Sequence, residues 1–470
     1  MRAGALSRWC VLALAWLQPA ALASPVPPTE QAADGTPLFI TRGMLEMPVR
    51  HANPAAGKLE VAYVRIQFDA EPTARAHLLL AGGPGASGVA AALSIARQGG
   101  HHARTLFGTD LIAMDQRGTG DSRPGLRIDL PYGIPLDVAS EASAWQPFVE
   151  SASRAAAAQL RARGIDLAAF TTRQSADDVE VLRQALGVKQ WTLWGHSYGT
   201  RLALEVLRQH PETVRRLILV APEGPGQTWK LPAATDEVLA RIGQRAGQKG
   251  LPAQMRRVLE RLRDQPRSVL VRDPVDGHRR RVLIGAFDVQ MLSWRALGDP
   301  RTLATLPAAY ARMAEGDFSA IAPLVLAMRQ KFGPQSALKQ VVDLSESAEP
   351  QRLTAIAAQQ DRAVLGAAVN FPGPGLASAW GVEDAGVEAR TPVTGPQPVL
   401  LLVGDLDART PLANAHAIAS GLPNAHVVRI IHAAHQFNVF GDERVRAVLA
   451  AFLAGRRVPA ELALDSVFSP

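Results

Sequence analysis

Short, almost purely apolar runs recur along the chain, and between them apolar residues return every three or four positions. A run of this kind, without polar alternation, is typical of a parallel strand buried on both faces. The stretches between the runs have the period of a helix, as residues 173–186 do. This alternation predicts an α/β protein with a doubly wound, mostly parallel sheet and helices on both faces. The runs cover residues 76–81, 109–114, 191–194, 216–221 and 397–403.

From residue 222 to 394 the helical pattern continues with little sign of such runs. We therefore expect residues 24–221 and 395–470 to form one α/β domain, with residues 222–394 inserted as a mainly helical cap. Residues 59–68 alternate in polarity, which predicts an antiparallel strand at the entrance to the sheet. Within the insertion, the segment 273–282 (Asp-Pro-Val-Asp-Gly-His-Arg-Arg-Arg-Val) predicts a solvated hairpin.

The first 23 residues are set apart by their composition. Two arginines precede a short apolar stretch, residues 11–17, and Ala21-Leu22-Ala23 has the small-x-small pattern of a cleavage site. The apolar stretch is too short for a stable membrane span. We expect residues 1–23 to be a signal peptide cleaved after Ala23, which predicts a periplasmic or secreted bacterial protein. The alternative is an uncleaved anchor, and Pro19 argues against a continuous membrane helix.

Composition narrows the functions that the chain can have. The single cysteine, Cys10, lies within the predicted signal peptide, so a mature chain would have no disulfide, thiol nucleophile or cysteine-ligated metal. The formal charge of +7 over 470 residues is modest. The densest basic cluster, residues 279–281, is not accompanied by a stripe of aromatic and basic residues, so we do not expect nucleic-acid binding.

One strand-to-helix junction carries candidate chemistry. The run 191–194 leads into Gly195-His-Ser-Tyr-Gly199, and a helical pattern follows. The pattern G-x-S-x-G between a buried strand and a helix is that of a nucleophile elbow, in which the glycines permit a crowded turn that exposes the Ser197 hydroxyl. An ordinary Gly-Ser turn is the alternative, and the motif alone does not decide. The strand and helix on either side favour the elbow.

A glycine-rich loop, Gly82-Gly-Pro-Gly85, follows the first buried run. It lacks the sequence patterns of phosphate-binding loops. We interpret it as an oxyanion loop, in which an N–H from Gly82 or Gly83 joins that of Tyr198 at a developing negative charge. A plain tight turn is the alternative.

The loop at residues 115–122, Asp-Gln-Arg-Gly-Thr-Gly-Asp-Ser, follows the next run. We expect side-chain hydrogen bonds and an internal ion pair of Asp115 with Arg117 to hold it. We interpret it as structural support beneath the site and not as a catalytic dyad.

The remaining catalytic groups are expected on later loops, in the order nucleophile, acid, histidine. The loop after the run 397–403 offers Asp405 and Asp407. Asp407 is expected to reach an imidazole, and Asp405 to form a turn hydrogen bond. The next loop offers His432, at the strand end, and His435, which is expected to be the base. His435 would then take the proton of the attacking Ser197, and Asp407 would orient the imidazole.

Several motifs together resemble the proline iminopeptidase and tripeptidyl aminopeptidase group of α/β-hydrolases. The resemblance covers roughly residues 60–221 and 395–455. It implies an α/β-hydrolase fold with a helical cap, and a serine exopeptidase that removes residues from free N-termini of peptides. We expect no cofactor and no metal. The group often has His where this chain has Ala81, and Gly-His-Gly at the histidine loop where this chain has Ala-His-Gln. The motifs are Gly82-Gly-Pro-Gly85, residues 115–120, residues 195–200, and Gly404-Asp-Leu-Asp407 with Thr410-Pro411.

The resemblance also implies that carboxylates of the cap hold the α-ammonium group of the substrate. Glu223, at the start of the insertion, is the candidate, and an ordinary loop glutamate is the alternative. Two other functions remain open at this point. One is a carboxylesterase or small-amide hydrolase with the same triad, and the other is a catalytically inactive binding protein on this scaffold.

Overall fold

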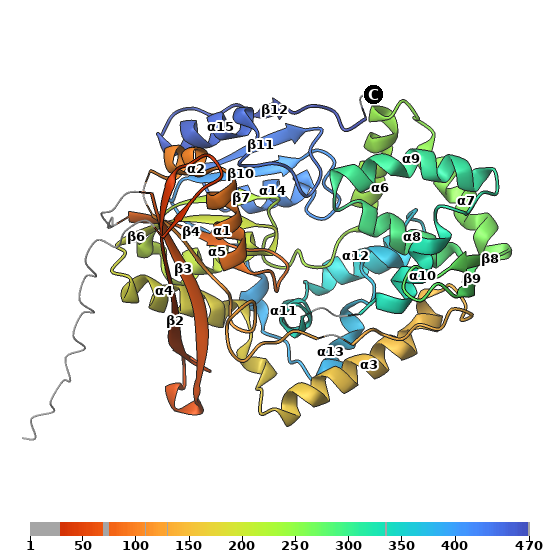
Figure 1. Ribbon diagram of the computed structural model, residues 1–470, viewed down its shortest axis with the longest axis horizontal. Helices are drawn as coiled ribbons and strands as arrows, with labels where there is room; N and C mark the ends of the chain where they lie inside the picture. The colour runs from red at the N-terminus through yellow and green to blue at the C-terminus, as the bar shows by residue number, and fades with distance from the viewer. Residues whose placement is uncertain (1–28, 69–74, 109, 129, 334–335, 469–470) are drawn as a thin grey trace, which may run out of the picture.

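The structure is a computed structural model that describes residues 29–68, 75–108, 110–128, 130–333 and 336–468. The predicted signal peptide, residues 1–23, lies outside the described residues. In Figure 1 a long twisted sheet and its helices occupy one side of the molecule, and a helical assembly occupies the other. None of the helices in the described ranges is long and apolar enough to cross a membrane.

Within the described residues, ten strands form one sheet. They are β1 (Glu30–Gln31), β2 (Pro37–Pro48), β3 (Lys58–Gln67), β4 (Arg75–Leu80), β5 (Asp110–Met114), β6 (Gln190–His196), β7 (Val214–Val220), β10 (Val399–Gly404), β11 (Ala425–Ile431) and β12 (Glu461–Ala463). Their spatial order is β1-β2-β3-β5-β4-β6-β7-β10-β11-β12. The pairs β1–β2, β2–β3 and β3–β5 are antiparallel, and the other neighbours are parallel. The predicted mostly parallel sheet and its antiparallel entry strand are confirmed.

The five apolar runs of the sequence supply the five central strands, β5, β4, β6, β7 and β10. All residues of β5 and β10 are buried, which explains why these strands lack polar alternation. The carboxyl ends of β4, β6 and β7 lie at the same level of the sheet, because Leu80 pairs with Gly195, and Gly195 pairs with Leu219. The loops that follow β4, β6, β10 and β11 therefore emerge at one edge of the sheet.

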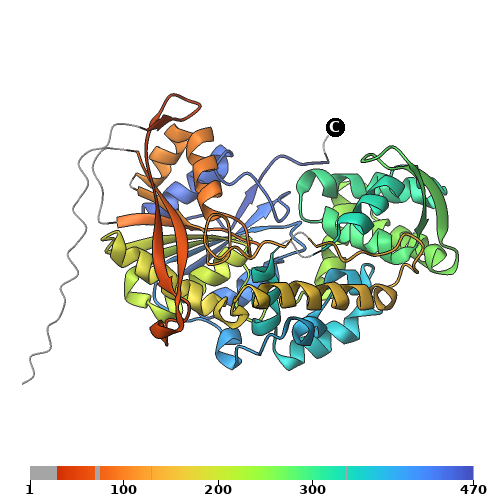
Figure 2. The same cartoon turned by 60° about the horizontal axis from the view of Figure 1, so that its bottom comes forward.

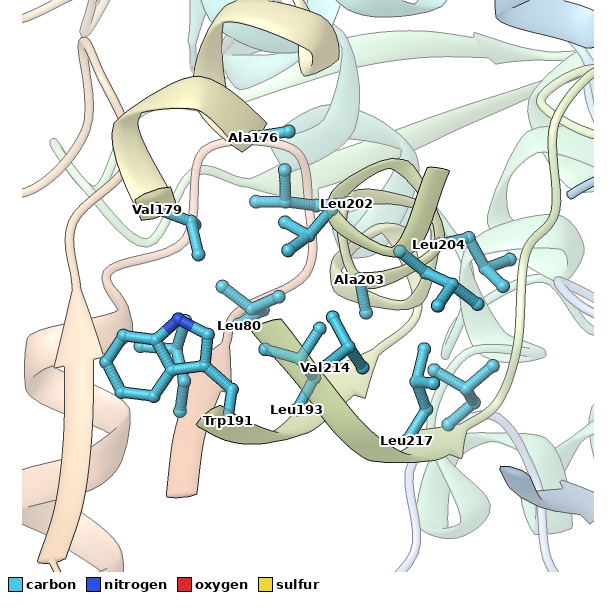
Figure 3. Close-up of a cluster of buried hydrophobic side chains, with 14 of the residues drawn as sticks. Leu80, Ala176, Val179, Trp191, Leu193, Leu202, Ala203, Leu204, Val214 and Leu217 are labelled. Carbon is cyan, nitrogen blue, oxygen red and sulfur yellow. The ribbon is translucent and has the colours of Figure 1, made fainter. Parts of the chain in front are cut away.

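Helices cover both faces of the sheet (Figure 2). One face packs against α1 (Gly88–Gln98), α2 (Gly100–Phe107) and α15 (Glu443–Leu453). The other face packs against α4 (Thr172–Ala185), α5 (Tyr198–Gln209) and α14 (Leu412–Ala419). Figure 3 shows part of this second core, to which Leu202 of α5, Val179 of α4 and Leu193 of β6 contribute. Burial of the apolar stripe of α5 holds the helix that begins at the predicted elbow.

The segment between β7 and β10 forms the helical assembly on the other side of Figure 1. It contains α6 (Pro232–Arg245), α7 (Leu251–Asp264), α8 (Ala286–Ala296), α9 (Pro300–Ala314), α10 (Ala322–Lys331), α11 (Ala337–Glu346), α12 (Pro350–Gln360) and α13 (Ala377–Trp380). The predicted hairpin is present as β8 (Arg267–Arg272) paired with β9 (Arg279–Ile284). Short 3₁₀ turns are η1 (Pro54–Ala56), η2 (Leu167–Ala169), η3 (Pro211–Thr213), η4 (Gly366–Val369), η5 (Pro374–Leu376) and η6 (Val387–Arg390).

Helix α3 (Ala142–Ala162) precedes the insertion in the chain but packs with this assembly. Its Trp145 is fully buried, with ring centroids 5.0 Å from Phe287 and 6.2 Å from Phe371. The structure thus adds α3 to the cap that the sequence pattern placed at residues 222–394. An amphipathic pattern shows that a helix has an apolar face, but it does not show which surface that face will meet.

Candidate active site

The turn at Ser197 joins β6 to α5 in a strained backbone conformation. Ser197 has φ 53° and ψ −124°, a region that L-residues rarely adopt. Its N–H donates a hydrogen bond to the Val220 carbonyl at 3.0 Å, which attaches the turn to β7. A Cβ at Gly195 would lie 2.6 Å from the Gly199 carbonyl, and a Cβ at Gly199 would lie 2.0 Å from that of Leu80. Both glycines are therefore required by close backbone approaches.

The structure brings Ser197, Asp407 and His435 together. His435 Nε2 lies 3.0 Å from Ser197 Oγ, and His435 Nδ1 lies 3.0 Å from Asp407 Oδ2. Asp407 is on the loop after β10, and His435 is on the loop after β11. The three groups thus form a continuous hydrogen-bonded chain across three loops at one edge of the sheet. Such a chain can move a proton from the serine hydroxyl to the imidazole.

The Asp407 carboxylate is fully buried and has several donors. Oδ1 accepts hydrogen bonds from the N–H groups of Arg409 and Thr410 at 2.7 and 2.8 Å, and Oδ2 accepts one from the Thr410 hydroxyl at 2.7 Å. Burial alone would raise the pKa of Asp407, but His435 and the Thr410 donors together lower it. The ionised carboxylate can hold a proton on Nδ1 of His435, so that Nε2 is free to accept one.

Asp405, the other aspartate of this loop, forms two sets of contacts that do not involve His435. Its Oδ1 accepts the His432 N–H at 2.7 Å, so it forms a turn hydrogen bond as expected. Its Oδ2 lies 3.1 Å from Arg245, and its carbonyl accepts a hydrogen bond from Arg241 at 2.5 Å. Both arginines belong to α6, so Asp405 also attaches the cap to the acid loop. This second set of contacts has no signal in the local sequence.

The Gly82–Gly83 loop runs directly beside Ser197. A Cβ at Gly82 would lie 3.1 Å from the Ser197 Cβ, and Gly83 has a φ of 113°. Tyr198 is the first residue of α5, so its N–H is at a helix N-terminus, where negative charge is favoured. The Tyr198 hydroxyl is buried at 2.9 Å from the Thr172 hydroxyl. Its backbone, and not its ring hydroxyl, is therefore the group available to the reacting atoms.

The prediction of an ion pair between Asp115 and Arg117 within the loop 115–122 is wrong. Arg117 donates to both carboxylate oxygens of Asp178 on α4, at 2.8 and 2.5 Å, and both side chains are fully buried. Asp115 instead accepts a hydrogen bond from the Ser87 hydroxyl at 2.6 Å and one from the Val89 N–H at 3.1 Å. Asp115 thus holds the start of α1, directly after the glycine loop. Tertiary packing, and not proximity along the chain, supplies the partner of Arg117.

Glu223 is buried beside the elbow helix and is already paired. Its carboxylate forms an ion pair with Lys230, and its N–H donates to the Thr200 hydroxyl at 2.8 Å. Burial would raise the pKa of Glu223, but the charges of Lys230 and Arg201 lower it. Any cationic group of a substrate would therefore share this carboxylate with Lys230.

Other buried charges near the elbow were not identified from the sequence. Arg201, one turn after Ser197, pairs with Glu346 of α11, and both side chains are almost fully buried. Arg201 also donates a hydrogen bond to the Thr228 hydroxyl at 2.5 Å. The position of Arg201 on the apolar stripe of α5 was a sequence signal for a buried charge. The sequence did not identify its partner, Glu346, which lies far along the chain. No set of three or more His, Cys, Asp or Glu in the described ranges is arranged to hold a metal ion.

The sheet order and the loops that carry Ser197, Asp407 and His435 define an α/β hydrolase. The chain belongs to this family, because the family described as alpha/beta hydrolase fold matches residues 78–442. The fold expected from the sequence is thereby confirmed.

Curated relatives confirm the resemblance to aminopeptidases. The tripeptidyl aminopeptidase of Streptomyces lividans is 28% identical over 207 residues, which cover 42% of this chain and 38% of the relative. The serine protease Hip1 of Mycobacterium tuberculosis (strain ATCC 25618 / H37Rv) is 30% identical over 190 residues, covering 38% and 35%. A probable proline iminopeptidase of Streptomyces coelicolor is 32% identical over 107 residues, covering 20% and 32%. The matched part of this chain thus spans less than two fifths of each of these relatives.

Solved structures of similar proteins cover more of the chain at lower identity. The proline iminopeptidase-related protein of Thermus thermophilus is 19% identical, with a TM-score of 0.36 and coverage of 88% of this chain and 98% of that chain. An epoxide hydrolase from an endophytic Streptomyces is 16% identical, with a TM-score of 0.41 and coverage of 90% and 99%. Likenesses of this extent carry no information about the substrate.

Proposed function

We propose that this protein is a serine aminopeptidase that cleaves peptides from a free N-terminus through an acyl-enzyme on Ser197. The hydrogen-bonded chain from Ser197 through His435 to Asp407, at 3.0 Å for each step, carries the proposal. The names of the curated relatives support the peptidase class, since they are tripeptidyl aminopeptidases, a serine protease and proline iminopeptidases.

The reaction follows from this geometry. His435 takes the Ser197 proton as Oγ attacks the scissile carbonyl, and Asp407 stabilises the resulting imidazolium. The Tyr198 N–H and an N–H of the Gly82–Gly83 loop stabilise the negative oxygen of the tetrahedral intermediate. Loss of one such donor costs about 3–4 kcal/mol of transition-state stabilisation in a known case. His435 then donates the Ser197 proton to the leaving nitrogen as the bond to the acyl carbon breaks, which gives the acyl-enzyme. Water attacks the acyl-enzyme with His435 acting again as the base.

We assign the substrate's α-ammonium group to the acidic side chains between α5 and the cap, with Glu223 as the first candidate. Because Lys230 already neutralises Glu223, the substrate's amine must share this carboxylate. We expect Glu223→Gln to raise KM for peptides with a free amine and to leave N-acylated esters unaffected. An equal effect on both substrates would remove Glu223 from this role.

The deciding experiment is a substrate panel. Prolyl, alanyl and tripeptidyl chromogenic amides are compared with short-chain nitrophenyl esters, using Ser197→Ala as the matched inactive control. Cleavage of amides with a free amine is expected. Turnover of esters without any amide would instead establish a carboxylesterase, which the same triad also supports.

Active-site labelling separates an enzyme from an inactive binding protein. A fluorophosphonate probe should label the folded protein and should not label Ser197→Ala. Absence of labelling in the wild type would favour the inactive scaffold.

Export is part of the same proposal. We infer that residues 1–23 direct the chain out of the bacterial cytoplasm and are removed after Ala23. N-terminal sequencing of protein from a periplasmic fraction should begin at Ser24. Recovery of the full-length chain in the cytoplasmic fraction would contradict the inference.

A further inference from the structure

A cavity of about 560 Å³ lies in the α/β domain beside the nucleophile. Its walls come from α1, α2 and the segment 437–441, which follows the histidine loop. Its floor is the sheet, with Leu79 of β4, Trp194 of β6 and Val220 of β7. The volume lies within the range of small-molecule sites, and most of the lining side chains are apolar.

One end of this cavity is lined by residues that neighbour the catalytic groups. Gly82 and His196 line it, and a Cβ at Gly82 would lie 3.1 Å from the Ser197 Cβ. The His196 ring centroid is 5.3 Å from that of His435, and His196 Nε2 is 3.4 Å from the His435 carbonyl. Trp194 and His196 are two residues apart on β6, so they face the same side of the sheet. The cavity therefore lies behind Gly82 and His196, on the side of Ser197 where His435 lies.

The direction of proton transfer identifies which half of the substrate faces that side. When the intermediate collapses, the bond between the acyl carbon and the leaving nitrogen breaks, and the acyl carbon stays on Ser197 Oγ. His435 Nε2 donates the proton it took from Ser197 to the departing nitrogen. The leaving half of the substrate must therefore lie against His435, and the residues after His435 form one wall of the cavity.

We propose that this cavity is the subsite for the leaving half of the substrate, and that it receives the first side chain after the scissile bond. The inference rests on the proposed function. The lining side chains Ala91, Ile95 and Leu106 on the helical wall favour an aliphatic or aromatic side chain in this position. The enzyme thus selects both sides of the cut, with the cap facing the N-terminal half and this cavity facing the other half.

The test uses peptides that share one N-terminal half and differ only in the residue after the scissile bond. Glycine, alanine, leucine and phenylalanine are compared at that position by product analysis. We expect kcat/KM to rise roughly 10- to 100-fold from glycine to leucine, because the apolar side chain leaves water.

A variant that fills the cavity distinguishes this subsite from a general preference for apolar peptides. Ala91 is a half-buried lining residue on α1, whereas the neighbouring Ala90 is exposed and is not among the lining residues. Ala91→Phe should abolish the preference for leucine over glycine, with a circular dichroism spectrum like that of the wild type. The matched control Ala90→Phe should keep the preference of the wild type. Ile95→Ala, which enlarges the cavity, should shift the preference toward phenylalanine.

Two results would overturn the proposal: a wild type indifferent to the leaving residue, or an Ala91→Phe variant that keeps the wild-type preference. Failure of the proposed function is recognised separately, because an esterase would cleave no peptide of the series. In that case, esters with alcohols of increasing chain length replace the peptides. The same loss of preference in Ala91→Phe is then expected, and its absence overturns the proposal.

Discussion

Arg117 is a buried cation that ties the loop after β5 to its surroundings, and its replacement allows a quantitative test. The guanidinium donates to both oxygens of Asp178 at 2.8 and 2.5 Å, and to the carbonyls of Val49 and Ala169 at 2.9 and 2.7 Å. Arg117→Met keeps much of the side-chain volume but leaves the Asp178 carboxylate buried, with His51 at 2.8 Å among its remaining partners. Removing one partner of a buried ion pair costs about 3–5 kcal/mol.

The assay is unfolding in guanidinium, followed by tryptophan fluorescence and far-ultraviolet circular dichroism. Arg117→Met should lower the free energy of unfolding by about 3–5 kcal/mol. The matched control is Arg50→Met, which breaks the pair with Asp166 at 2.6 Å, where the side chains are 44% and 42% exposed. Because solvent screens this second pair, its loss should cost less than about 1 kcal/mol.

A double variant isolates the cause. In Arg117→Met with Asp178→Leu, no carboxylate is left without its cation, so most of the lost stability should return. The reasoning is refuted if Arg117→Met unfolds within about 1 kcal/mol of the wild type. It is also refuted if the double variant is no more stable than Arg117→Met alone.

Three further outcomes are expected. Asp407→Asn should lower kcat by about 10⁴-fold with an unchanged circular dichroism spectrum, because an amide favours the wrong tautomer of the His435 imidazole. A smaller loss in steady-state kinetics would show that another group orients His435. Burial, with a contribution from the charge of His435, lowers the pKa of His196 from 6.5 to about 4. Between these two pH values the imidazole is therefore protonated in the unfolded chain and neutral in the folded chain. The free energy of unfolding should therefore fall by up to about 3 kcal/mol as pH drops from 6.5 to 4. In unfolding titrations, His196→Gln should make the dependence of this free energy on pH shallower, and an equal dependence in variant and wild type would contradict the assignment. Arg245→Ala removes the Arg245–Asp405 contact at 3.1 Å. It should speed amide hydrogen exchange in α6 and leave the amides of β10 protected, whereas equal changes in both elements would indicate global destabilisation.

The arrangement of Ser197, His435 and Asp407 was predictable because each of the three has a local sequence signal. The elbow needs glycines at 195 and 199, where backbone atoms would meet any side chain. The order of the strands along the chain then restricts the acid and the base to the loops after β10 and β11. Within those loops, Asp407 and His435 were favoured over Asp405 and His432, and the distances of 3.0 Å agree with that choice.

The secondary-structure elements follow from local sequence patterns: the apolar runs form buried parallel strands, the segments of helical period form the covering helices, and the glycine motifs form the tight turns at Ser197. The partners of the charged groups and the surfaces on which helices pack depend on the folded structure. Arg117 meets Asp178 and not Asp115, Glu223 meets Lys230, and α3 lies with the cap. The physical reason is the distance along the chain over which each effect acts. Backbone geometry and hydrophobic periodicity act between neighbouring residues, whereas a buried charge or an apolar face is satisfied by whatever group the folded chain brings to it.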